Sequence, residues 1–195
     1  MQEHKKRILL HTCCAPCASY VIELLKPDYD ITLFFYNPNI EPEDEYIKRK
    51  NELSKLLLIV NSSQESSQIK LLNNEYDNDI FETAVLPYHN QPEGGERCTE
   101  CFRIRLYETA KRAKAEKYDI FTSTLSVSPH KNAKLLNKIG QSAANEYKID
   151  YLEADFKKKD GYLHSIKLTK EYNLYRQSYC GCNNSKLINQ RNNRK

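Results

Sequence analysis

Seven cysteines in three short groups are the residues of this chain best suited to chemistry. The groups are Cys13-Cys14-Ala15-Pro16-Cys17, Cys98-Thr99-Glu100-Cys101 and Cys180-Gly181-Cys182. An odd number of cysteines argues against a framework in which every thiol forms a structural disulfide. A buried cysteine can instead be a small apolar residue that only packs in the core. Three separate groups favour metal binding or redox chemistry instead.

The first two groups predict a metal centre. The spacing of Cys98 and Cys101 lets two thiolates face one metal or cluster. Cys13 and Cys14 are adjacent, and adjacent residues in a tight turn can bind two irons of one cluster. Together these residues supply four thiolates, which suits a [4Fe-4S] cluster and equally a zinc ion. Cys17 can ligate a second metal, donate a proton or simply pack.

The third group, Cys180-Gly181-Cys182, has a different spacing. One intervening glycine allows a strained disulfide in a small ring. Strain makes a disulfide easier to reduce, which favours a catalytic over a structural role. The alternative is that both thiols are additional metal ligands.

Hydrophobic periodicity predicts the elements that position these groups. We expect strands at 7–10, 31–36, 118–125 and 148–153. The run from Leu56 to Val60 fits either the end of the second helix or a third strand, and we favour a strand that begins near Leu58. We expect helices at 18–25, from Pro42 to about 57, at 97–117, 133–147 and 168–175, and a short one within 74–88. Alternating strands and helices predict an α/β fold with a doubly wound, mostly parallel sheet. The first cysteine group then lies at the carboxyl end of the first strand, where ligands bind.

The chain is expected to form a single domain over 1–195. Residues 7–155 would form the α/β core, and 156–188 a C-terminal extension that packs Cys180-Gly181-Cys182 back on the active site. Residues 189–195 are expected to be a flexible basic tail. The net charge of +4 permits a nucleic-acid partner without requiring one. No secretory signal and no apolar run long enough to span a bilayer is found, so we expect a cytoplasmic protein without a membrane partner.

Other polar residues give weaker signals. Ser126, Ser128 and His130 follow a central strand, so they should line the same crevice as substrate-binding residues. Lys157, Lys158 and Lys159 are either a solvated face or contacts to an RNA backbone. The turn after the first strand has no glycine-rich phosphate loop, which disfavours ATP as a cofactor.

Six blocks of sequence, in one order, carry a family resemblance. They are His11-x-Cys-Cys-Ala-Pro-Cys17, Phe35-Tyr-Asn-Pro-Asn39, Arg97-Cys-x-x-Cys-Phe-x-x-Arg-Leu106, Thr122-Ser-Thr-Leu-Ser-Val-Ser-Pro-His-Lys131, Asp155-Phe-Lys-Lys158 with Gly161-Tyr162, and Tyr175-Arg-Gln-Ser-Tyr-Cys-Gly-Cys182. From Ile8 to Ser185 the chain resembles the QueH-type epoxyqueuosine reductases. The resemblance implies a Rossmann-like, nucleotide-hydrolase-like fold. It also implies removal of the epoxide oxygen of epoxyqueuosine in tRNA, the last step of queuosine synthesis.

The resemblance also implies roles for individual residues. Cys13, Cys14, Cys98 and Cys101 would hold a [4Fe-4S] cluster, and Cys180 and Cys182 would be the redox-active pair. Cys17 stands where some relatives have Asp and could bind an adjacent iron ion. Arg176 and Tyr179, in the last block, would contact substrate. The expected partners are tRNA carrying epoxyqueuosine at the anticodon and an external electron donor, without cobalamin.

Two other functions fit parts of the sequence. One is an ATP-dependent tRNA-thiolating enzyme on the same fold, since fold alone does not determine function. The other is a zinc-stapled RNA-binding module, in which Cys180-Gly181-Cys182 would have no evident role.

Overall fold

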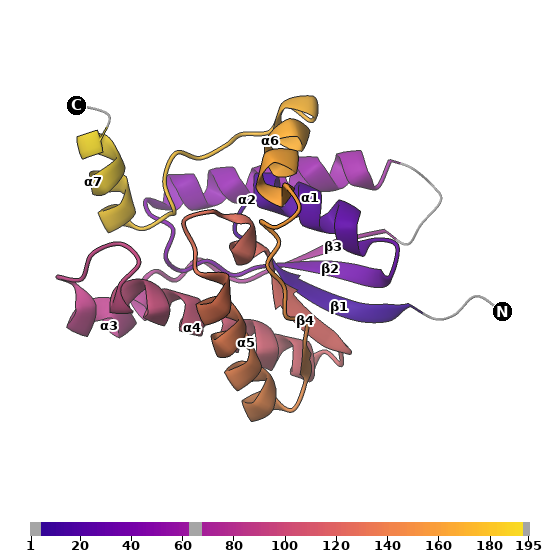
Figure 1. Cartoon of the computed structure of the whole chain (residues 1–195), viewed down its shortest axis with the longest axis horizontal. Helices are drawn as coiled ribbons and strands as arrows, with labels where there is room; N and C mark the ends of the chain where they lie inside the picture. The colour runs from indigo at the N-terminus through magenta and orange to yellow at the C-terminus, as the bar shows by residue number, and fades with distance from the viewer. Residues whose placement is uncertain (1–4, 63–67, 193–195) are drawn as a thin grey trace.

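The computed structural model, which describes residues 5–62 and 68–192, contains a five-stranded sheet in the order β3-β2-β1-β4-β5 (Figure 1). Every neighbouring pair of strands is parallel, which confirms the predicted fold class. The strands are β1 (Lys6–His11), β2 (Tyr29–Phe35), β3 (Lys70–Asn73), β4 (Ile120–Ser123) and β5 (Asp150–Tyr151).

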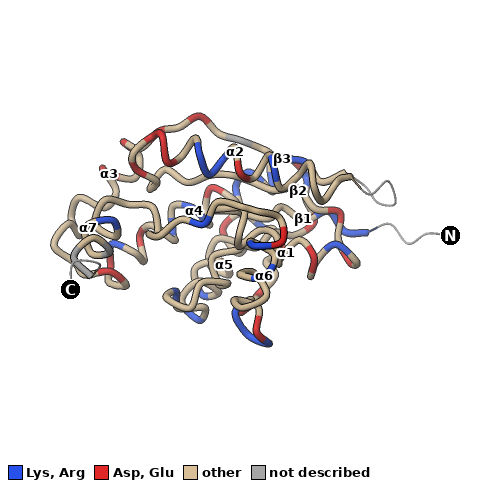
Figure 2. Tube along the Cα trace, turned by 90° about the horizontal axis from the view of Figure 1, so that it is seen from above, with Lys and Arg blue, Asp and Glu red and all other residues tan. Residues whose placement is uncertain are grey.

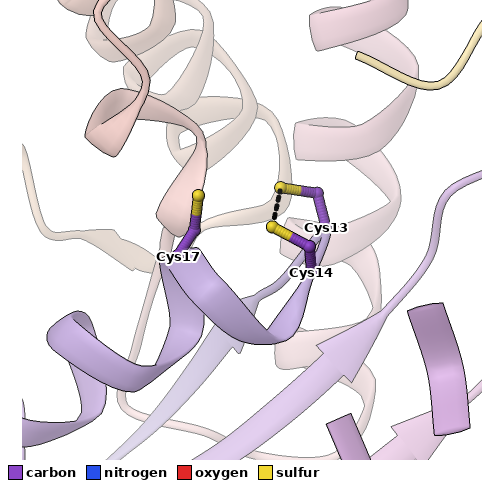
Figure 3. Close-up of side chains that lie close together, drawn as sticks. All are labelled: Cys13, Cys14 and Cys17. Atoms are coloured by element: carbon purple, nitrogen blue, oxygen red, sulfur yellow. Dashed lines mark hydrogen bonds between the residues drawn. The ribbon is translucent and has the colours of Figure 1, made fainter. Parts of the chain in front are cut away.

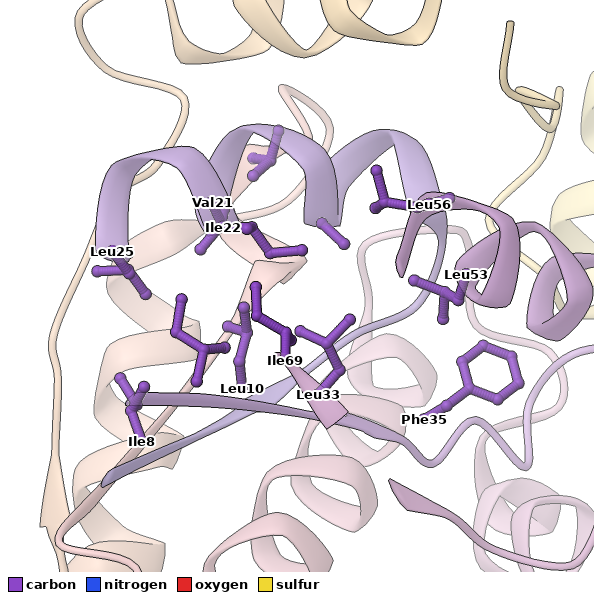
Figure 4. Close-up of a cluster of buried hydrophobic side chains, with 14 of the residues drawn as sticks. Ile8, Leu10, Val21, Ile22, Leu25, Leu33, Phe35, Leu53, Leu56 and Ile69 are labelled. Carbon is purple, nitrogen blue, oxygen red and sulfur yellow. The ribbon is translucent and has the colours of Figure 1, made fainter. Parts of the chain in front are cut away.

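Helices cover both faces of this sheet. They are α1 (Ala15–Leu25), α2 (Glu43–Val60), α3 (Asp79–Val85), α4 (Glu96–Ala115), α5 (Ala133–Tyr147), α6 (Gly161–Glu171) and α7 (Asn183–Asn192), with 3-10 turns η1 (Leu86–Tyr88) and η2 (Thr124–Val127). The helices α1 and α2 lie on one face, with α6 packed on α1 (Figures 1 and 4). On the other face lie α4 and α5, which pack against each other.

Alternation along β1 divides the core between the two faces. Ile8 and Leu10 point toward α1 and α2, whereas Leu9 packs with Phe34 and Phe121 beneath α4 and α5 (Figure 4). All of these side chains are fully buried, as expected for a parallel sheet with helices on both faces. The sheet is therefore a rigid base for the loops at its carboxyl edge.

The order of the strands reverses between β1 and β4. The chain runs from β1 to β2 and β3 in one direction, then returns through α4 to pair β4 with the opposite edge of β1. In open α/β sheets the crevice outside such a reversal is the usual ligand site. In this chain, the turn that contains Cys13 and Cys14 follows β1 directly at that point.

Two predicted elements are wrong. The apolar run from Leu56 to Val60 completes α2 and does not begin a strand, because Leu53 and Leu56 continue one buried helical face while Leu58 is 77% exposed. A short apolar run cannot by itself distinguish a strand from the end of a helix. The helix predicted at 168–175 begins and ends earlier, at Gly161 and Glu171.

The C-terminal segment after β5 returns to the core before it reaches the third cysteine group. Phe156 and Leu174 are buried in the cluster formed by α1, α2 and the sheet. The helix α7 continues to Asn192, inside the segment predicted as a tail, and 193–195 lie outside the described residues. Within the described residues, no helix has the length and apolar character needed to cross a membrane.

Candidate metal and redox site

The first cysteine group occupies the junction between β1 and α1. Pro16, in the first turn of α1, suits a helix start because its missing N–H is not needed there. The Sγ atoms of Cys13, Cys14 and Cys17 all lie within 4.8 Å of one another, and those of Cys13 and Cys14 are 3.8 Å apart (Figure 3). Three thiols this close can serve as ligands to one metal centre.

The second group lies on the first turns of α4. The Gly94 N–H donates to the Sγ of Cys98 across 3.2 Å. Cys98 packs against the apolar cluster that contains Cys13 and Cys14, although it lies far from them in the sequence. Cys101 is buried beside Cys182 in a neighbouring cluster. The two segments therefore meet at the carboxyl edge of the sheet, with the sulfurs of Cys98 and Cys101 outside the 4.8 Å group formed by the first three.

The third group is held in a loop between α6 and α7. The buried guanidinium of Arg49, on α2, donates to the carbonyl of Cys180 at 3.0 Å and to that of Tyr179 at 3.2 Å. The carbonyl of Gly181 accepts from the N–H of Glu41 at 2.9 Å. Gly181 has φ of +146°, and a Cβ there would lie 2.8 Å from Nδ2 of Asn39. Glycine is therefore the residue this position requires.

Charges around the sulfurs favour a thiolate at one position. Hydrogen bonds from the Cys14 and Cys17 thiols hold the pKa of Cys13 well below its usual value, with help from the nearby cations Lys131 and Arg105. The hydrogen bond to Cys13 raises the pKa of Cys14 to about 11. Burial raises the pKa of the Cys101 thiol to about 12. A bound metal would favour the thiolate form at the others.

His11 connects the ends of three strands. Its Nδ1 lies 2.8 Å from Oγ of Ser123, and its Nε2 lies 3.0 Å from the carbonyl of Tyr36. Burial lowers the pKa of His11 to about 3, so the imidazole is neutral at physiological pH. His11 thus fixes the relative positions of the strand ends around the cysteines.

The predicted substrate-binding residues have separate locations. Ser126 is buried, and its Oγ accepts from the N–H of Phe156 at 3.2 Å, which ties the start of the extension to η2. The Oγ of Ser128 accepts from the N–H of His130 at 3.3 Å, and the His130 side chain is exposed.

In the last sequence block, the exposed Arg176 lies over the ring of Tyr162 at 5.2 Å. The hydroxyl of Tyr179 donates to the carbonyl of Glu41 at 2.5 Å. Tyr179 therefore helps to anchor the loop that carries Cys180.

The three consecutive lysines differ from one another. The Nζ of Lys157 donates to Asp155 at 3.0 Å and to the carbonyl of Lys131 at 3.1 Å. Lys158 and Lys159 are exposed. Basic and acidic residues are otherwise interspersed along the chain (Figure 2).

Fold and site together define a class of protein. It is a doubly wound α/β protein in which the first cysteine group follows β1, the second packs beside it from α4, and the third packs against the Cys101 cluster, an arrangement suited to metal and redox chemistry. Comparison with known proteins then gives the family. Residues 8–187 match the family model described as epoxyqueuosine reductase QueH.

Three relatives carry the same description. The chain is 42% identical over 180 residues to epoxyqueuosine reductase QueH of Staphylococcus epidermidis, covering 91% of this chain and 75% of the relative. It is 40% identical to the protein of that description from Streptococcus pyogenes serotype M1, covering 90% and 68%. For Thermotoga maritima the identity is 33%, covering 90% and 88%. The chain belongs to the epoxyqueuosine reductase QueH family, whose members are oxidoreductases.

A solved structure supports the fold alone. A predicted subunit of a tRNA methyltransferase from Methanocaldococcus jannaschii superposes with a TM-score of 0.54 at 16% sequence identity, covering 84% of this chain and 76% of that one. At this identity the similarity carries no information about the reaction.

Proposed function

We propose that this chain reduces epoxyqueuosine in tRNA to queuosine, with a [4Fe-4S] cluster held by Cys13, Cys14, Cys98 and Cys101. The observation that supports it most strongly is the packing of Cys98 on the cluster that contains Cys13 and Cys14, in a chain of the QueH family. Neither of the alternative functions, an ATP-dependent thiolating enzyme or a zinc-stapled module, is favoured by these relatives.

The cysteine site fits a thiolate-bound cofactor. Its donors are sulfurs at one edge of the sheet, and the cations Arg105 and Lys131 lie close enough to Cys13 to lower its pKa. Thiolate-bound iron–sulfur clusters carry negative charge, which these cations would balance. When bound, the cluster would supply electrons singly, and an adjacent iron ion, with Cys17 among its ligands, would act as a Lewis acid.

The reaction requires two electrons and two protons. Both C–O bonds of the epoxide break, a C=C bond forms and the oxygen leaves as water. When Cys180 and Cys182 are oxidised from dithiol to disulfide, they release two electrons and two protons, which balances the reaction. An external reductant then restores the dithiol. The hydrogen bonds from Arg49 and Glu41 hold this loop in place, beside Cys101.

The modified base must leave its stack to reach this crevice. Ser128 and His130 lie after η2 at the carboxyl edge of the sheet, where they can contact the polar part of the substrate. Arg176 and the Tyr162 ring beneath it form a surface on which a base can stack. Tyr179 and Ser126 support the site by holding the third cysteine group and η2. Lys158 and Lys159 would contact the tRNA backbone in the cytoplasm.

The direct test is turnover by the full chain after reconstitution with iron and sulfide under anaerobic conditions. The protein is incubated with epoxyqueuosine-tRNA and a chemical reductant, and the nucleosides are analysed by mass spectrometry. We expect a product lighter by one oxygen atom, without added cobalamin or ATP. No product from protein that carries the cluster would contradict the proposal, and turnover that depends on ATP would favour the thiolating alternative.

A further inference from the structure

Arg105 is a buried cation at the centre of the carboxyl edge. It lies on α4, one turn after Cys101, and it is 1% exposed. Within the part of the chain that the structure describes, no carboxylate comes within 4.0 Å of its guanidinium. A buried charge without a counter-charge is strongly unfavourable, so a group near Arg105 must supply the balancing negative charge.

Among the described residues, three side chains lie within hydrogen-bonding distance of the Arg105 guanidinium. Nη2 donates to Oδ1 of Asn37 at 2.6 Å, Nη1 lies 3.8 Å from Sγ of Cys101, and Nε lies 3.4 Å from Nε2 of His11. Asn37 carries no charge. The shorter contact of His11 Nε2 is with the carbonyl of Tyr36, at 3.0 Å, and it places the imidazole proton on that nitrogen. Cys101 is therefore the contact that can carry a negative charge.

Sulfurs from the other two groups act on Arg105 as well. Burial works against the charged guanidinium, but the charges of Cys101, Cys13 and Cys180 outweigh it and raise the pKa of Arg105. These residues come one from each cysteine group. Asn37 keeps the guanidinium in this position, because its Nδ2 donates to the carbonyl of Thr12 at 2.8 Å while its Oδ1 holds Nη2.

We propose that Arg105 is the fixed counter-charge of the cysteine site, and that through its N–H contact with the Cys101 sulfur it raises the reduction potential of the group held there. This inference rests on the proposed function, in which Cys101 is a cluster ligand. Arg105 is then a positioning residue that acts through Cys101. Its positive charge and its hydrogen bond to sulfur stabilise the more negative, reduced form of the cluster relative to the oxidised form.

The test compares Arg105→Gln with the matched control Arg103→Gln. Arg103 lies on the same helix, but it is exposed and paired with Glu100. Both variants are reconstituted anaerobically, and the reduced fraction is measured by electron paramagnetic resonance at fixed potentials. For R105Q we expect at least a tenfold fall in the ratio of reduced to oxidised protein, a shift of about 59 mV to lower potential for one electron. For R103Q we expect no change. Equal potentials in both variants would overturn the inference.

Further arms cover the remaining outcomes. If R105Q does not fold, the variant Arg105→Lys is measured instead. Lysine keeps the positive charge but lacks the fork that bonds Asn37 and Cys101 together, so we expect the reduction potential to fall by less than the change expected for R105Q. A wild-type potential would contradict the inference. If the wild-type chain takes up zinc and no iron–sulfur group, the proposed function fails by itself. The counter-charge is then tested by zinc affinity, which should fall at least tenfold in R105Q and stay unchanged in R103Q; equal affinities would overturn it.

Discussion

Nη1 of Arg49 donates a hydrogen bond to the backbone carbonyl of Cys180 across 3.0 Å, which joins the middle of α2 to the third cysteine group. Arg49 is 1% exposed, and its Nε lies 2.7 Å from Oε1 of Glu45. One side chain therefore connects an ion pair on α2 to a loop 131 residues further along the chain. We expect the position of the Cys180 and Cys182 thiols to depend on this contact.

Replacing Arg49 with Ala should weaken both the fold and the reaction. Removing one partner of a buried ion pair costs about 3–5 kcal/mol, because the other charge is left uncompensated. We expect a loss of that order in urea unfolding and at least a tenfold loss of turnover, with iron content unchanged. Asn51→Ala, on the exposed side of the same helix, is the control. Wild-type turnover by R49A would show that the loop does not need this anchor.

The Cys180→Ser/Cys182→Ser double variant separates the redox pair from the cluster. If these thiols supply the electrons for the reaction, the variant should bind iron and sulfide as the wild-type chain does and yet give no product above background. The converse control is Cys98→Ser, which should lose cluster content. Reductant-driven turnover at the wild-type rate in the double variant would remove the dithiol from the mechanism.

Stability should fall in alkaline solution because of Tyr36. Burial raises the pKa of this phenol to about 12, where its ring stacks on Phe34. Between pH 10 and 12 the unfolded chain loses the proton and the folded chain keeps it, so stability present below pH 10 declines as pH rises, by about 1.4 kcal/mol per pH unit from this group. Urea unfolding at pH 9 and pH 11 should show a smaller decline in Tyr36→Phe. The same decline in both proteins would contradict this assignment.

The three consecutive lysines differ in their exposure and in their hydrogen bonds. Lys158 and Lys159 are exposed, whereas Lys157 is bonded to Asp155 and to the carbonyl of Lys131. The Lys158→Ala/Lys159→Ala variant should bind tRNA more weakly, with a smaller dependence of log affinity on log salt, by about one unit of slope per lost phosphate contact. The control Lys5→Ala/Lys6→Ala removes two exposed lysines at the amino end of β1. If the two variants have the same salt slope, these lysines are only solvated.

The sequence predicted the fold class but not every strand. Its short apolar runs identify β1, β2 and β4, whereas β3 at Lys70–Asn73 was not predicted. Because the carboxyl ends of parallel strands meet at one edge, the turn that carries Cys13 and Cys14 could be placed there from the sequence. Periodicity misassigned Leu56 to Val60, because a short apolar run fits the end of a helix as well as a strand.

Long-range contacts to backbone atoms could not be predicted. Arg49 acts on the carbonyls of Tyr179 and Cys180, and a carbonyl has the same chemistry in every residue, so no pattern of residue types reveals the pair. Arg105 stands in the sequence block that also contains Cys98 and Cys101. Its burial between Asn37 and His11 emerges only in the folded chain.

The most direct test of the central claim, that cysteines near residues 13 and 100 hold one inorganic cofactor, is the iron and acid-labile sulfide content of the full chain purified without oxygen. We predict about four irons and about four sulfides per chain for a [4Fe-4S] cluster, with further iron if Cys17 helps to bind an adjacent ion. Cys98→Ser/Cys101→Ser should lose most of both. A chain that contains zinc without sulfide, or a double variant that keeps the full count, would contradict the account.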